Sequence, residues 1–132
     1  MITTAEDQIL ALHEPTITML HELGISICRL GYKYLTVAVP CYSVDDIQSL
    51  TKEMYPYVAA HFGYHNWRSV ERSIRCVILD AWERRDPDVW DRYFPDQKKV
   101  PTNKQFIATL AVHLRTPLPK WEGGDCQEDF SA

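Results

Sequence analysis

Three arginines at helical spacing are the residues of this chain that could recognise an anionic partner. Arg68, Arg72 and Arg75 follow one another at intervals of four and three residues, which a helix brings onto one face. Glu71 stands at the border of that face. Guanidinium groups on the N-terminal half of a helix are typical of a helix that enters the major groove of DNA. Charges at this spacing also occur on helix faces that only meet water, so the pattern by itself leaves both interpretations open.

The arginine helix also needs a buried side and a defined start. Apolar residues recur across residues 66–84 at the spacing of one helical stripe: Val70, Ile74, Val77, Ile78, Ala81 and Trp82. Asn66 is a helix-capping residue type. Before it, Pro56 opens a short helix, PYVAAHF, that Gly63 closes. Two helices joined by a short turn containing glycine, the second with a basic face, predict a helix-turn-helix unit.

Capping residues and prolines divide the rest of the chain into further short helices. The predicted helices are 4–13, stopped by Pro15; 17–23, capped by Thr16 and closed by Gly24; 43–54, opened by a capping box of Ser43 and Asp46; 86–94, with Asp86 and Pro87 at its start and Pro95 at its end; and 102–114, opened by a capping box of Thr102 and Gln105.

Residues 25–39, ISICRLGYKYLTVAV, are ambiguous. Their isoleucine, valine, threonine and tyrosine content favours a β-hairpin that turns near Gly31. A short apolar run of this kind is equally compatible with a buried helix. Propensity alone does not decide between the two.

Charge is unevenly distributed along the chain. The net charge is -4, but eight of the 18 acidic residues lie in residues 1–22 and 121–132, where no lysine or arginine occurs. The remaining 10 acids face all 14 bases in residues 23–120, which leaves that part near +4. A moderate local basic bias is compatible with a nucleic-acid partner and also with an ordinary charged surface.

Several classes of protein are disfavoured. No run approaches the ~18 apolar residues of a membrane span, and the N-terminus lacks the features of a signal peptide, so we expect a cytoplasmic protein with no membrane contact. Four widely spaced cysteines, Cys28, Cys41, Cys76 and Cys126, suit reduced thiols better than a zinc site or a disulfide frame. His61 and His65 lack the glutamate of a zinc-protease motif. We therefore expect no metal, no cofactor and no enzymatic activity.

Five sequence pieces in order resemble one known family. VERSIR at Val70 to Arg75 is similar to the Val-Glu-Arg-x-Ile-Arg motif in the C-terminal DNA-binding domain of the sporulation stage-zero master response regulator of endospore-forming Firmicutes. The other pieces are ITMLHELGI (17–25), GYKYL (31–35), TKEMYP (51–56) and PTNKQFIATLAVHLR (101–115). Together they cover residues 17–115 and are more specific than a helix-turn-helix pattern alone.

The resemblance implies an all-α fold, a compact bundle of about six helices, and therefore a helix after Gly31. It implies specific binding to double-stranded DNA, head-to-tail pairing of two copies on tandem boxes, and contact with an RNA polymerase sigma subunit. Base reading carries over to Glu71 and Arg72, with Arg75 in the neighbouring contact position. Together with Arg68, these are the residues that we expect to read bases in the major groove. Arginine can bind guanine O6 and N7 together, and glutamate can accept from the cytosine amino group. We assign contacts to the DNA backbone to Asn66, Trp67, Ser69, Lys98, Lys99 and Lys104.

The chain also departs from the family pattern. Ser69 stands where many members have arginine, Cys76 where many have histidine, and the turn at residues 63–67 is one residue longer. Only about fifteen residues precede the match, too few for the family's phosphate-accepting receiver domain, so we expect that control by phosphorylation is absent or comes from another protein.

These inferences lead to one domain and two hypotheses. We expect an N-terminal extension at 1–15, a helix-turn-helix effector domain at 16–116 and an acidic tail at 117–132. The leading hypothesis is a sequence-specific transcription regulator. The alternative is a protein-interaction module of the same fold that docks on a sigma subunit or another regulator without reading DNA.

Overall fold

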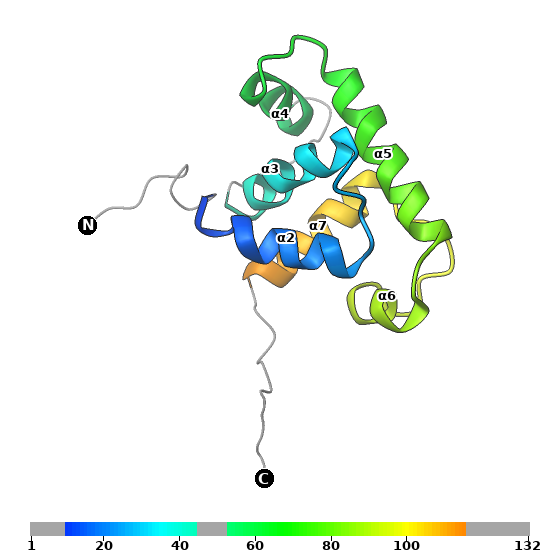
Figure 1. The fold of residues 1–132 in the computed structure, drawn as a ribbon. Helices are drawn as coiled ribbons and strands as arrows, with labels where there is room; N and C mark the ends of the chain where they lie inside the picture. The colour runs from blue at the N-terminus through cyan, green and yellow to red at the C-terminus, as the bar shows by residue number, and fades with distance from the viewer. Residues whose placement is uncertain (1–9, 45–52, 116–132) are drawn as a thin grey trace, which may run out of the picture.

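The computed structural model describes residues 10–44 and 53–115, which form six helices and no strand (Figure 1). The helices are α2 (His13–Glu22), α3 (Leu30–Val44), α4 (Tyr55–His61), α5 (Trp67–Glu83), α6 (Pro87–Tyr93) and α7 (Asn103–Arg115). The predicted all-α fold is confirmed. Within this described part, no helix is both long and apolar enough to span a membrane.

Helix α3 lies at the centre of the fold and packs most extensively against α7 and α5. Ten of its residues are buried, including the unbroken run from Tyr34 to Cys41. A helix enclosed on all sides has no polar face and therefore no amphipathic period. This explains why residues 25–39 looked equally like a hairpin: burial in the core outweighs the strand preference of Thr36 and Val37. The helix even continues through Pro40.

Helix α2 begins earlier than predicted. Pro15 does not stop a helix but lies in the first turn of α2, where a missing N–H costs no hydrogen bond. Thr16 is therefore not the cap; its hydroxyl donates to the Leu12 carbonyl at 2.7 Å. The predicted end is confirmed, since Gly24 has φ +83° and Ile25 N–H donates to Leu20 O at 2.9 Å, the bond of a glycine-terminated helix. Most of the predicted helix 4–13 lies outside the described residues.

The predicted capping role of Ser43 is wrong. Ser43 is buried in the last turn of α3, which runs to Val44, so it cannot begin a new helix. Residues 45–52, which would form most of the predicted helix 43–54, lie outside the described part of the chain. Helix α4 begins at Tyr55, one residue earlier than predicted, so Pro56 is its second residue and not its first.

Helix α5 crosses one side of the domain from α4 to α6 (Figure 1). Its predicted apolar stripe is confirmed: Val70, Ile74, Val77, Ile78 and Ala81 are at most 1% exposed, and Trp82 is partly buried. Gly31 in the first turn of α3 allows the two helices to approach closely. A Cβ at that position would lie 2.3 Å from the Ser73 carbonyl oxygen.

The last two helices start as predicted. The Asp86 carboxylate accepts from Asp88 N–H at 3.0 Å and caps α6. Thr102 and Gln105 form a complete capping box at α7, with reciprocal bonds of 2.9 and 3.1 Å. The Trp90 indole donates to the Leu23 carbonyl at 3.0 Å and ties α6 to the end of α2.

Candidate nucleic-acid interface

The predicted helix-turn-helix unit consists of α4, a short turn and α5. Gly63 has φ +80°, and Tyr64 N–H donates to Ala59 O at 2.8 Å, which closes α4. The Asn66 side chain accepts from Arg68 N–H at 2.9 Å and caps α5 as predicted. Hydrogen bonds therefore define both ends of the turn, one where α4 ends and one where α5 begins.

The outer surface of α5 is a stripe of exposed residues, which we call the α5 stripe: Arg68, Arg72, Cys76, Leu79 and Glu83. The Arg68 guanidinium lies 5.0 Å from the centre of the Trp67 ring, a cation–π contact. Among residues 10–44 and 53–115, nothing forms a hydrogen bond or ion pair with Arg72. The stripe thus offers two accessible guanidinium groups at its N-terminal end, while its C-terminal end is not basic.

Arg75 is placed differently from the other two arginines. It is only partly exposed, and its Nη1 donates to the Pro101 carbonyl oxygen at 2.6 Å. Glu71 is exposed beside Arg72, but it forms no ion pair with Arg75, although the two are four residues apart. The structure therefore brings Arg68, Glu71 and Arg72 together at the surface and commits part of the Arg75 guanidinium to the segment before α7.

Three predicted backbone-contact residues shape the start of α5. Asn66 uses its side-chain oxygen in the cap, and the Ser69 hydroxyl donates to the Asn66 carbonyl at 2.8 Å. Trp67 is partly buried and stacks on Tyr55 of α4, with ring centres 6.0 Å apart and planes 6° from parallel. These contacts fix the first turn of α5 against α4.

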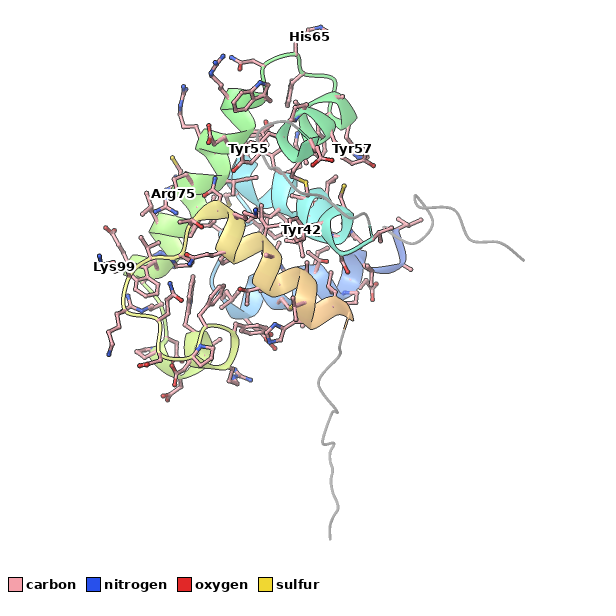
Figure 2. All side chains as sticks on the ribbon, turned by 180° about the vertical axis from the view of Figure 1, so that it is seen from behind. Tyr42, Tyr55, Tyr57, His65, Arg75 and Lys99 are labelled. Atoms are coloured by element: carbon pink, nitrogen blue, oxygen red, sulfur yellow. The ribbon has the colours of Figure 1, made fainter. Side chains whose placement is uncertain are left out.

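The three predicted lysines lie close in sequence to Pro101, whose carbonyl Arg75 of α5 contacts. Lys98 and Lys99 are exposed in the loop before α7, and Lys104 is exposed in its first turn. Lys98 is 3.6 Å from the Asp96 carboxylate, and both side chains are over 80% exposed, so water screens this pair. Figure 2 shows Lys99 and Arg75 on the same side of the molecule.

Sequence reasoning missed Asn103 and Tyr55. Asn103, the first residue of α7, is 8% exposed, and its Nδ2 donates to Tyr55 Oη at 3.0 Å and to Glu71 O at 3.2 Å. The capping box marked where α7 begins, but no local pattern shows that its first residue contacts two other helices. The available signal was the residue type: asparagine has a poor helix propensity, so its place directly after the Thr102 cap indicates a role other than helix formation.

A recess lies at the far end of α5 from Arg68 and Arg72. It is lined by His21, Gly24, Ile25, Ser26, Ile27, Arg29, Asp80 and Arg84. The Asp80 and Arg84 side chains pair at 2.6 Å. Arg84 also donates to the Gly24 carbonyl at 3.0 Å. In the part of the chain that the structure describes, no group of histidines, cysteines and acids is arranged to hold a metal.

Comparison with known families agrees with this geometry. Residues 16–114 match the family model described as "Sporulation initiation factor Spo0A C terminal". The match runs from the first turn of α2 into the last turn of α7 and so includes both helices of the helix-turn-helix unit. This is a family of DNA-binding regulator domains and not a family of enzymes. The chain therefore belongs to the Spo0A C-terminal family, the DNA-binding effector domains of sporulation regulators.

Proposed function

We propose that this protein is a sequence-specific transcription regulator whose helix α5 reads bases in the major groove of double-stranded DNA. The observation that carries the proposal is the N-terminal end of the α5 stripe. There Arg68 and Arg72 are exposed, Arg72 has no partner among the described residues, and Glu71 lies next to them. Recognition helices read bases with their N-terminal residues. Arg72 fits a guanine and Glu71 fits a cytosine amino group.

Arg75 contributes to the same surface in a different way. One of its nitrogens is bound to the Pro101 carbonyl, so the remaining guanidinium N–H groups are those available to a base or phosphate. This contact also holds the loop of Lys98 and Lys99 next to α5. We propose that these lysines and Lys104 meet phosphates, which supplies affinity without sequence preference.

The start of α5 supports a phosphate contact through its backbone. The Asn66 side chain accepts from Arg68 N–H, and the Ser69 hydroxyl donates to Asn66 O. The other N–H groups of the first turn have no acceptor within the helix. Such groups bind phosphate readily. We propose that Asn66, Trp67 and Ser69 contact the DNA backbone in this way.

We also propose partners for the protein. Two copies bind tandem sites head to tail in the cytoplasm and contact a sigma subunit of RNA polymerase. Ile27, in the connection between α2 and α3, and Leu30, the first residue of α3, are 63% and 55% exposed, which favours them as a surface for a protein partner.

The second candidate, an interaction module that does not read DNA, has one observation in its favour. The C-terminal end of the α5 stripe carries Cys76, Leu79 and Glu83, which offer phosphate no cation. A protein partner would fit this half of the helix better than DNA does.

Selection of bound duplexes from a random DNA library, followed by an anisotropy titration, tests the proposal. We expect the library to converge on one site, and the selected duplex to bind at least about 10³-fold more tightly than a scrambled duplex at the same salt concentration. Equal, weak binding to both duplexes would reject sequence-specific reading and favour the interaction module.

A further inference from the structure

Asn103 joins the two helices of the helix-turn-helix unit to α7. From the first position of α7, its Nδ2 reaches Tyr55 Oη in α4 at 3.0 Å and Glu71 O in α5 at 3.2 Å. Tyr55 is 2% exposed and stacks on Trp67 at the start of α5. A single buried amide of α7 thus contacts both α4 and α5.

The orientation of this amide is dictated by its neighbours. Glu71 O is a carbonyl oxygen and accepts hydrogen bonds only, so the NH₂ group of Asn103 must face it. Turning the amide over would place two acceptor oxygens against each other. As a consequence, the buried Asn103 Oδ1 receives no hydrogen bond from the part of the chain that the structure describes. The two acceptors, Tyr55 Oη and Glu71 O, therefore hold the amide in one orientation.

Two hydrogen bonds one helical turn apart hold α5 on this side. Asn103 donates to Glu71 O, and Arg75 donates in the opposite direction to Pro101 O. Together they join the second turn of α5 to the segment of Lys98, Lys99 and Lys104. The side chains proposed to read bases and those proposed to meet phosphates are therefore held in one fixed arrangement.

We infer that Asn103 is a positioning residue for the recognition helix and controls sequence discrimination more than overall affinity for DNA. The inference rests on the proposed DNA-reading function. Base contacts require α5 to lie correctly in the groove, because bidentate bonds depend on both distance and angle. Lysine–phosphate contacts are long-range and flexible, so they tolerate a small displacement of α5.

Asn103→Ala tests the inference through a ratio of two affinities. Binding is measured by anisotropy for the duplex selected on the wild-type protein and for a scrambled duplex, over a series of salt concentrations. We expect the ratio of the two affinities to fall about tenfold or more, the effect of one displaced base contact. The scrambled-duplex affinity and its salt slope should be unchanged, since no phosphate contact is removed. An unchanged ratio would overturn the inference.

Two further variants separate positioning from a loss of stability. Tyr55→Phe keeps the ring stacked on Trp67 and removes only the hydroxyl that holds the amide, so it should lower the ratio by a smaller factor. Thr16→Val is the matched control, because Thr16 is 0% exposed and hydrogen-bonded but lies in α2. Partial unfolding lowers both affinities equally, so Thr16→Val should leave the ratio unchanged. A reduced ratio in Thr16→Val would contradict the inference.

The outcomes also distinguish this inference from the proposed function. If the wild-type protein does not prefer the selected duplex, the proposed function fails first. If the wild type discriminates and Asn103→Ala discriminates equally well, the proposed function stands and only the role of Asn103 is rejected.

Discussion

The Nη1 atom of Arg75 donates a hydrogen bond of 2.6 Å to the carbonyl oxygen of Pro101, 26 residues further along the chain. The same guanidinium lies on the face of α5 that carries Arg68 and Arg72. One side chain therefore belongs both to the proposed recognition surface and to the packing that holds this surface against α7.

We predict that Arg75→Ala lowers the free energy of unfolding by about 1 to 2 kcal/mol, because it removes a charge-assisted hydrogen bond to a backbone carbonyl at a partly buried site. Arg75→Lys should recover part of the loss, since an ammonium group can make one such bond. Urea denaturation measures both. Arg72→Ala is the control, because Arg72 is exposed and makes no contact of this kind with a described residue; it should stay within about 0.5 kcal/mol of wild type. Equal stability of Arg75→Ala and wild type would show that the contact with Pro101 is not stabilising.

Arg72→Ala and Lys98→Ala should weaken DNA binding in different ways. Loss of Arg72 removes a base contact and should cost about 1 to 3 kcal/mol on the selected duplex, with relaxed preference at one base step. Loss of Lys98 should weaken selected and scrambled duplexes alike and reduce the salt slope by about 1. Anisotropy titrations over a series of salt concentrations measure both effects. Identical behaviour of the two variants would argue against the division of roles.

Gly31→Ala should destabilise the fold by about 2 to 3 kcal/mol. The new Cβ would lie 2.3 Å from Ser73 O and 2.7 Å from a Val77 methyl group, so α3 and α5 must move apart. Gly24→Ala is the matched control, because a Cβ there meets nothing within 4 Å. The control should cost only about 1 to 2 kcal/mol, from the left-handed backbone. A smaller loss for Gly31→Ala than for Gly24→Ala in thermal unfolding would contradict the close approach of the two helices.

Alkaline pH should weaken the contact between α6 and α2. The Tyr93 hydroxyl donates to Glu22 Oε1, and burial together with this carboxylate raises the pKa of Tyr93 above its ordinary value of 10.0. Because the folded-state pKa is raised, the stabilisation is complete below pH 10.0 and is lost as the pH rises through the folded-state pKa.

The test compares unfolding free energies of wild type and Tyr93→Phe from neutral pH to above pH 10.0. The wild type should have the larger unfolding free energy. Its difference from Tyr93→Phe should be constant near neutral pH and shrink at high pH, since phenylalanine does not ionise. A difference that does not change with pH would show that Tyr93 ionises equally easily in the folded and unfolded chain.

Local signals within a few residues predicted most helix ends correctly. Asn66, Asp86 and the Thr102–Gln105 pair cap α5, α6 and α7 as expected. Gly24 and Gly63 end α2 and α4. Each of these bonds spans at most five residues, so the partners are already close in the sequence. The two wrong caps, Thr16 and Ser43, are capping residue types that lie inside helices, and Pro15, predicted to stop a helix, lies in the first turn of α2.

The tertiary structure decided the conformation of α3 and the contacts between residues far apart in the sequence. Burial on all sides makes α3 a helix despite its strand-like composition, and the family resemblance rather than the periodicity predicted this correctly. The sequence by itself determined a helix with a buried stripe and an arginine face. Only packing decided that Arg75 binds Pro101 and that Asn103 contacts Glu71 from 32 residues away. Contacts at such separation depend on how helices pack, because residues far apart in the sequence meet only when the core forms.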